Sequence, residues 1–564
     1  MLCFLSDLLY NIIVRKWEKR VDKIKKNSFA SNVVMLMISN IVIKLLGLVY
    51  RLAITNVQGF GDLGNGYYSA GYQVYAVLLI ISSQGIPGAV SKLVSAKVAN
   101  DDYKGAHKIF KVALWVFGLI GLLCSVFLLL FSDFIASKML NVPDVTYVLK
   151  VLSPAIFFVC VSAVIRGYFA GLGTMGASSK SQSLEQFFNC VLTITFVYAL
   201  VGKDAYIMAA GGNVSTTLAV LISFSYLLLF YKRNIKKFSN VSDKKIQLDT
   251  ESSKKIAKVI IMTAIPLTIG SVISVITAFI DTMTVSNCIQ IAYQNILPTK
   301  QLLEQEAMKA TGILSKVDTL VNLPLAINLS FYVALIPEIT GLIAKKDMKT
   351  AARKISSSIA TSLFIIIPCS VGFITLAQPI LNMLYPNASN GALVLQIASV
   401  TMVLVAINHT LQGSLFGLGK MYVPALALVC GSIVKIILNL ILISNPNIGM
   451  YGAPISSFVC QLITFTIIYI TLKKSIKFNI DINKSLVKPI FSSLVMGITI
   501  ILLRYFLSGI IGNTILTILC IFIGIIIYGL LTIKLQIFTK EEILGFPFGN
   551  KIYSLLLKLR LCKE

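Results

Sequence analysis

Long uninterrupted apolar runs are the feature that most limits how this chain can fold. One run extends from Val112 to Phe131 without a charged residue. A helix of about 20 residues, rising about 1.5 Å per residue, crosses a hydrocarbon core of about 30 Å. Such runs recur along the 564 residues, and only 13% of the residues are charged, against roughly 25% in soluble domains. The sequence therefore predicts an all-α polytopic membrane protein.

The basic residues predict fourteen membrane-spanning helices and their orientation. Alternate connections, together with both termini, hold 39 of the 50 Lys and Arg residues, and the opposite connections hold six. Because positively charged loops stay in the cytoplasm, we expect a plasma-membrane protein with both termini cytoplasmic. The same asymmetry accounts for the net charge of +27 without a nucleic-acid partner.

An internal repeat predicts two similar lobes. Gly-Tyr-Phe-Ala-Gly-Leu-Gly-Thr-Met at 167–175 recurs as Gly-Ser-Leu-Phe-Gly-Leu-Gly-Lys-Met at 413–421, displaced by 246 residues. A second match, from 89–106 to 334–351, has nearly the same displacement. Both copies of each motif fall on the predicted cytoplasmic side, which indicates two pseudo-symmetric six-helix lobes related by an axis along the membrane normal. Two further C-terminal helices follow the second lobe.

The predicted organisation divides the chain into six segments, four of them basic and outside the lobes. They are a basic amphipathic segment on the membrane surface at 1–28, a first lobe at 29–231, a basic cytoplasmic loop at 232–256, a second lobe at 257–472, a basic loop with the last two spans at 473–533, and a basic amphipathic tail at 534–564.

Motifs for covalent or metal chemistry are missing from the sequence. Gly417 to Lys420 resembles part of a phosphate-binding loop, but Met421 replaces the Ser or Thr that would hold magnesium. No nucleophile elbow, metal-ligand cluster or pair of catalytic carboxylates is present. We therefore expect a protein that is not an enzyme and needs no metal or cofactor.

Charged residues inside the predicted spans are the candidate functional residues, because a charge at mid-bilayer costs about 2.5–3.5 kcal/mol. Lys44 and Arg51 are seven residues apart and share a helix face, and Arg166 lies in the fourth span. Guanidinium groups offer paired donors that suit a phosphate. The alternative is that these charges snorkel or form ion pairs with intramembrane acids such as Glu185 and Asp318.

Four motifs of the first half carry a resemblance to a known family. They are Ile-Lys-Leu-Leu-Gly-Leu-Val-Tyr-Arg-Leu at 43–52, Gly-Ile-Pro-Gly-Ala-Val-Ser-Lys-Leu-Val-Ser at 85–95, Arg-Gly-Tyr-Phe-Ala-Gly at 166–171 and Ser-Gln-Ser-Leu-Glu-Gln at 181–186. The sequence resembles the MurJ-type and stage V sporulation protein B branch of the polysaccharide flippases, which belongs to the MOP superfamily with the MATE drug exporters.

This resemblance implies alternating access and export of a polyprenyl-pyrophosphate-linked saccharide, which is lipid II for MurJ-type members. It also implies that Arg51 lines the transport cavity and that Gln182, Glu185 and Gln186 are motif residues. MurJ-type proteins commonly carry an arginine on span 8, where here only Lys316 offers a positive charge.

A second departure from the MurJ-type pattern concerns the ion to which transport is coupled. Some MurJ-type relatives are thought to bind sodium between spans 7, 11 and 12. Here Lys435 occupies the middle of span 11, so its ammonium could stand in for a bound cation, and Asp281 is the candidate partner for a cation or proton. Another departure is Asn189, where the branch often has an arginine.

The favoured function is flipping of a lipid-linked cell-wall precursor to the outer leaflet, with the substrate and membrane lipids as partners. Three alternatives stay open: a teichoic acid or capsular oligosaccharide flippase, a MATE-like cation-coupled drug exporter, and a non-transporting scaffold that recruits cell-wall synthases. The composition, rich in Asn, Ile and Lys, suits a low-GC Gram-positive bacterium.

Overall fold

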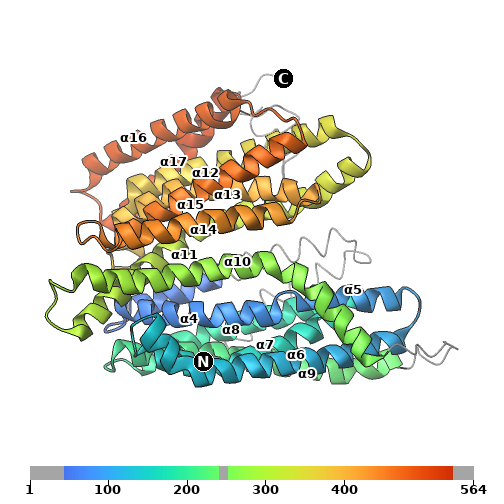
Figure 1. The fold of residues 1–564 in the computed structure, drawn as a ribbon. Coiled ribbons are helices and arrows are strands. Elements are labelled where there is room, and N and C mark those ends of the chain that lie inside the picture. The colour runs from blue at the N-terminus through green and yellow to red at the C-terminus, as the bar shows by residue number, and fades with distance from the viewer. Residues whose placement is uncertain (1–43, 175, 240–251, 538–564) are drawn as a thin grey trace.

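The computed structural model describes residues 44–174, 176–239 and 252–537, and its regular secondary structure within these ranges is entirely helical (Figure 1). A first helix covers 44–55. It is followed by α4 (Gly61–Ser83), α5 (Ile86–Val98), α6 (Tyr103–Phe134), α7 (Val145–Gly171), α8 (Gly176–Ala199), α9 (Ala205–Ser239), α10 (Ser253–Tyr293), α11 (Lys300–Ala344), α12 (Met348–Leu384), α13 (Ala392–Gly417), α14 (Tyr422–Leu442), α15 (Gly452–Ser475), α16 (Lys488–Leu507) and α17 (Asn513–Lys534).

Short helical turns η2 (Ile135–Met139), η4 (Gly449–Tyr451) and η5 (Asn483–Val487) adjoin the longer helices. The predicted surface segment 1–28 lies outside the described residues, as does nearly all of the predicted tail 534–564.

Thirteen of the fourteen predicted spans fall on helices of the described residues, which supports the polytopic fold. The first predicted span, 29–57, is described only from residue 44 onward, where a helix covers 44–55. By length and composition, 11 helical segments of the described ranges could cross a membrane, with α4 and α5 counted as one segment. The two long helices outside this set are α8 and α11. The first half of α8 carries Lys180 and Glu185, and α11 carries charged residues from Lys300 to Glu338. These two helices also contribute several residues to the site described below.

Several predicted boundaries differ from the observed ones. The second predicted span, expected at 67–91, is two helices, α4 and α5, separated at Gly85. A Cβ atom on Gly85 would lie 2.4 Å from the Ala264 carbonyl oxygen of α10, and Pro87 occupies the first turn of α5, where a missing N–H costs nothing. The eighth span was expected at 313–343, but α11 begins 13 residues earlier, at Lys300, because the charged residues before 313 are helical as well.

The packing of the helices repeats in the two halves of the chain. In the first lobe α6 packs on α7, α8 on α9, and α7 on α9. In the second lobe α12 packs on α13, α14 on α15, and α13 on α15. Figure 1 shows the two lobes as separate layers, with α10 and α11 between them and α16 and α17 on the outside of the second lobe. The pseudo-symmetric arrangement expected from the sequence repeat is confirmed.

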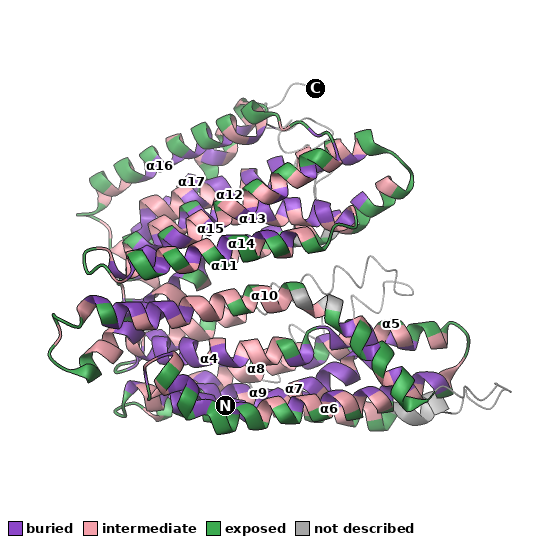
Figure 2. Ribbon diagram, viewed as in Figure 1, coloured by how far each residue is buried: buried purple, intermediate pink, exposed green. Residues whose placement is uncertain are grey.

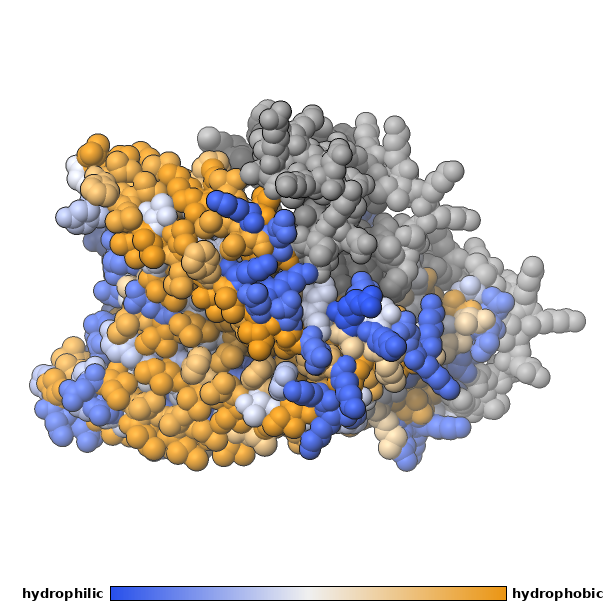
Figure 3. All heavy atoms as spheres, turned by 90° about the horizontal axis from the view of Figure 1, so that it is seen from above, coloured by the Kyte–Doolittle hydropathy of each residue, from blue (hydrophilic) through white to orange (hydrophobic). Residues whose placement is uncertain are grey.

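Apolar side chains cover the outside of this bundle as well as its core. Buried residues gather inside each lobe (Figure 2), whereas Leu130 on α6, Ile441 on α14 and Phe522 on α17 are more than 60% exposed. Figure 3 shows a broad apolar surface with hydrophilic residues at its edges. A soluble protein rarely exposes so much contiguous apolar area, so this surface faces lipid.

Candidate functional site

Helices α4 and α11 cross near their N-terminal ends and join the two lobes. A Cβ atom on Gly66 would lie 1.8 Å from the Met308 carbonyl oxygen. A Cβ atom on Gly312 would lie 1.8 Å from the Asp62 carbonyl oxygen. Small residues let two backbones approach this closely. Gly66 and Gly312 are 246 residues apart, the displacement of the repeat, so the crossing lies at the axis that relates the lobes.

Arg51 reaches this crossing from the first helix. Its Nη1 donates to the Ser69 hydroxyl of α4 at 3.4 Å and to the Ser315 hydroxyl of α11. The two serine hydroxyls are 2.7 Å apart and, like the glycines, are related by 246 residues. The guanidinium carbon lies 5.9 Å from the centre of the Tyr68 ring, within the range of a cation–π interaction. Arg51 therefore bridges both lobes through neutral groups.

In the described part of the chain, Arg51 is held by neutral hydroxyl groups rather than by an ion pair. No ion pair of the described residues includes Arg51. The side chain lies deep within the protein, yet part of it remains accessible. Arg51 thus lies where α4 of the first lobe meets α11 of the second, with part of its side chain still accessible.

Lys316 also lies on α11, but it is paired with an acid. Its Nζ is 2.6 Å from Asp62 Oδ1 on α4, and its side chain is 0% exposed. The ammonium also donates to the Ala388 carbonyl oxygen and lies 5.3 Å from the centre of the Tyr385 ring. Lys316 thus forms a buried ion pair between the lobes and is closed to a ligand in this conformation.

Arg166 is held inside the first lobe. Its Nη2 donates to Glu185 Oε2 at 2.7 Å and to the Ser223 hydroxyl at 2.9 Å, and its Nε donates to the Ser181 hydroxyl at 3.0 Å. These contacts tie α7 to α8 and α9. The structure therefore brings Arg166 together with the motif residue Glu185, and places neither of them in contact with Arg51.

The two predicted coupling residues meet each other in the second lobe. Lys435 on α14 forms an ion pair with Asp281 on α10. Asn439 donates to Asp281 Oδ1 at 3.2 Å and to the Thr284 hydroxyl at 3.0 Å, and it accepts a hydrogen bond from Ser456 on α15. The ammonium of Lys435 thus sits on a carboxylate that is surrounded by further oxygen-bearing side chains.

The remaining sequence candidates lie at the edges of this arrangement. Lys44 is exposed at the start of the first helix, two turns from Arg51. Gln182 and Gln186 are half-buried on α8, on either side of Glu185. No group of three His, Cys, Asp or Glu residues that could hold a metal occurs in the part of the chain that the structure describes.

Comparison with known proteins identifies the family. The family model described as a polysaccharide biosynthesis protein matches residues 29–342, more than half of the chain. The chain belongs to this family. It is 26% identical over 502 residues to the lipid II flippase MurJ of Bacillus subtilis (strain 168), which covers 84% of this chain and 88% of that relative. It is 24% identical over 461 residues to the stage V sporulation protein B of the same organism, with coverages of 81% and 86%.

A solved structure has the same fold. The lipid II flippase MurJ in an inward closed conformation matches with a TM-score of 0.65 at 16% sequence identity, covering 89% of this chain and 99% of that chain. The resemblance stated from four motifs of the first half is therefore confirmed for the fold and the family.

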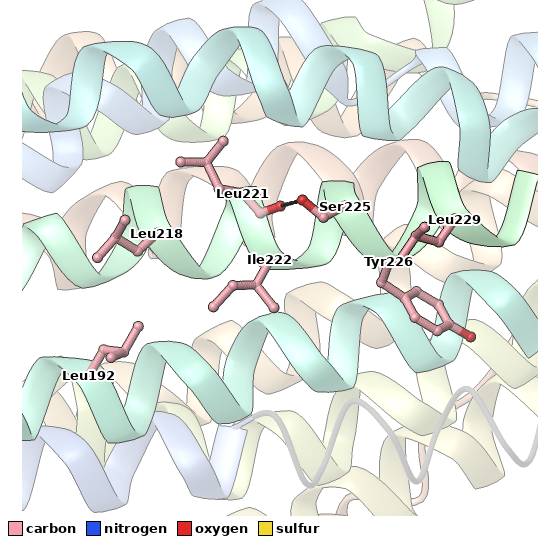
Figure 4. Close-up of a pocket in the computed structure, with 7 residues that line it drawn as sticks. All are labelled: Leu192, Leu218, Leu221, Ile222, Ser225, Tyr226 and Leu229. Carbon is pink, nitrogen blue, oxygen red and sulfur yellow. Dashed lines mark hydrogen bonds between the residues drawn. The ribbon is translucent and has the colours of Figure 1, made fainter. Parts of the chain in front are cut away.

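In this member of the family, a shallow groove on the first lobe is lined by side chains other than those around Arg51. Seven residues of α8 and α9 line it (Figure 4): Leu192, Leu218, Leu221, Ile222, Ser225, Tyr226 and Leu229. Ser225 turns its hydroxyl to the Leu221 carbonyl oxygen of its own helix. The groove offers an almost wholly apolar lining, which suits hydrocarbon rather than a pyrophosphate or a sugar.

Several residues of the site were not identified from the sequence. Asp62 and Asn439, which complete the two ion-pair clusters, were not singled out. The pairs Gly66 with Gly312 and Ser69 with Ser315 were also missed, although each repeats at a displacement of 246. Extending the repeat search to this Gly-x-x-Ser pattern would have found the crossing of α4 and α11.

Proposed function

We propose that the protein is a flippase that moves a polyprenyl-pyrophosphate-linked saccharide, similar to lipid II, from the cytoplasmic to the outer leaflet by alternating access. The observation that carries this proposal is Arg51, an accessible arginine without a carboxylate partner between the two lobes. Its planar guanidinium suits the oxygens of a pyrophosphate.

The other deeply placed basic residues strengthen the assignment to Arg51. Arg166, Lys316 and Lys435 are each neutralised by a carboxylate. An anion that enters between the lobes would therefore have to break an ion pair at those positions, whereas Arg51 needs only to release two serine hydroxyls. The MurJ relative, named as a lipid II flippase, supports a lipid-linked saccharide as the substrate class.

The way the lobes meet supports entry from the basic end of the bundle. The contacts between α4 and α11 involve the first three turns of α4 and the fourth and fifth turns of α11, toward the end opposite the basic connections. Beyond Ser315 the face of α11 that carries Asp318, Asn322 and Leu329 is exposed. A head group could reach this face from the basic end, which we take to be cytoplasmic, while the lipid tail stays in the bilayer.

The proposal also covers the chemistry, the orientation in the membrane, the source organism and the partners of the protein. We infer transport without covalent chemistry, a cytoplasmic position for both termini and a Gram-positive source. Recruitment of cell-wall synthases stays a prediction from the sequence. Teichoic acid or capsular precursors are alternative substrates because they share the pyrophosphate and lipid that Arg51 and the bilayer would hold.

Reconstitution tests the function and complementation tests the substrate. Purified protein in liposomes should move a polyprenyl-pyrophosphate-linked saccharide between leaflets, and protein with Arg51→Ala should not. Rescue of a strain depleted of its own lipid II flippase would assign lipid II. Transport of a lipid-linked teichoic acid precursor without rescue would assign the alternative substrate, and absence of transport of every pyrophosphate-linked lipid would refute the proposal.

The Asp281–Lys435 pair predicts transport that does not depend on sodium. Because the ammonium of Lys435 already occupies the carboxylate, added sodium should leave the thermal stability and transport rate of the parent protein unchanged. In Lys435→Ala, Asp281 loses that ammonium and keeps Asn439 beside it, so sodium should raise the melting temperature more than equal potassium does. A steep sodium dependence in the parent that survives Lys435→Ala would contradict this prediction.

A further inference from the structure

Asp318 is an acidic side chain in the inter-lobe space that the proposed mechanism leaves unused. It lies on α11, three residues beyond the Ser315 that Arg51 contacts, which is one helical turn on the same side of the helix. Asp318 is surrounded by protein and yet exposed to solvent. Because a carboxylate facing lipid would be costly, this accessible surface suits the space between the lobes better than the bilayer.

The charged groups near Asp318 make their own contacts with other residues. Arg51, Lys435 and Asp281 are close enough to interact with it electrostatically, but Lys435 is paired with Asp281. Arg51 donates to serine hydroxyls. No ion pair of the described residues includes Asp318. The inter-lobe space thus presents an unpaired carboxylate about one helical turn from an arginine that has no carboxylate partner.

Beyond Asp318, the exposed face of α11 continues toward the basic end of the bundle. Asp318, Asn322, Leu329 and Val333 are all exposed, and at 100° per residue they lie within about 60° of one another around the helix. Lys316, two residues away, is buried on a different side against Asp62. The acid is therefore turned toward the space that a head group would occupy.

An anionic substrate alone would not suit this pair of charges. A pyrophosphate beside Arg51 would lie near the Asp318 carboxylate, and like charges in a region of low dielectric repel strongly. A substrate that also carries a cationic group would place opposite charges against both side chains. An intramembrane carboxylate is costly unless something of opposite charge offsets it.

We propose that Asp318 forms a cation subsite that binds an ammonium group on the saccharide head of the transported lipid. The inference rests on the proposed flippase function and narrows its substrate to lipid-linked saccharides that carry a free amine. Arg51 would hold the pyrophosphate, and Asp318 would accept hydrogen bonds from the ammonium one helical turn away.

Two probes that differ at one amine test the subsite. They are polyprenyl-pyrophosphate-linked glucosamine, with a free amine, and the same lipid with N-acetylglucosamine, which is neutral at that position. Binding and flipping are measured with the full-length protein in liposomes. The parent should favour the free amine by about tenfold or more, as expected for a hydrogen bond between charged groups.

Variants of Asp318 distinguish a cation subsite from other roles of this carboxylate. Asp318→Asn should lose the preference by weakening only the free-amine probe, and Asp318→Glu should retain it. Glu306→Gln removes an exposed carboxylate from the same helix and should change neither probe. Arg51→Ala should weaken both probes equally, since they share the pyrophosphate.

Three outcomes would overturn the subsite. Equal handling of both probes by the parent would remove the subsite and leave the flippase function intact. Equal loss of both probes in folded Asp318→Asn would mean that the acid balances Arg51 or carries a proton. A parent protein that binds and moves neither probe would refute the proposed function, and the subsite with it.

Discussion

Replacing Arg51 with alanine should abolish transport of a pyrophosphate-linked lipid while leaving the protein folded and inserted. The side chain donates to Ser69 and Ser315 and contacts the Tyr68 ring. No ion pair of the described residues includes it, so its removal leaves no acid in those ranges without a partner. Loss of hydrogen bonds to a charged ligand, worth about 1.5–3 kcal/mol, corresponds to roughly ten- to a hundredfold in binding. Substrate binding and flipping in liposomes measure the effect.

Lysine and a remote arginine provide the controls. Arg51→Lys keeps the charge and loses the planar fork, so partial activity would indicate charge recognition and near-complete loss would indicate paired hydrogen bonds. Arg504 on α16 donates to Asn513 and Thr517 of α17, outside the inter-lobe space, and Arg504→Ala should retain transport. Full activity of Arg51→Ala would remove the cationic cavity from the mechanism.

The sequence predicted the helices well because membrane-spanning helices are determined by local composition. A run such as 112–131 is apolar whatever its neighbours are, and α6 (Tyr103–Phe134) covers it completely. The repeat at 167–175 and 413–421 likewise predicted the packing of the two lobes, because equivalent sequences pack their helices in equivalent ways. The start of α11 was harder, since its charged first turns at the membrane edge look like a loop.

The partners of the intramembrane charges were harder to predict, because they depend on contacts distant in sequence. Arg51 was a good candidate and remains unpaired, but Arg166 is occupied by Glu185, and Lys316 is paired with an acid 254 positions away. Nothing local to Lys316 distinguishes an ion pair from a ligand contact. Only the close crossing of α4 and α11 places Asp62 beside it.

Replacing Lys316 with methionine should destabilise the protein strongly. The change leaves Asp62, itself only 9% exposed, as a buried carboxylate without its counter-charge. Removal of one partner from a buried ion pair costs about 3–5 kcal/mol. The melting temperature of the purified protein should therefore fall markedly, whereas Lys309→Met, which breaks an exposed pair with Glu306 on the same helix, should cost only about 0–1 kcal/mol.

The double variant distinguishes a structural ion pair from a substrate contact. With Asp62→Asn added to Lys316→Met, no buried charge remains unpaired, so most of the lost stability should return. If Lys316 instead binds substrate, as the sequence suggested, Lys316→Met would stay stable and lose substrate binding, and the second change would restore nothing.

If the pair holds α4 and α11 together, the stable double variant should also open more readily between the lobes at the end opposite the basic connections. Increased labelling of a single cysteine at that crossing by an impermeant thiol reagent would measure this opening.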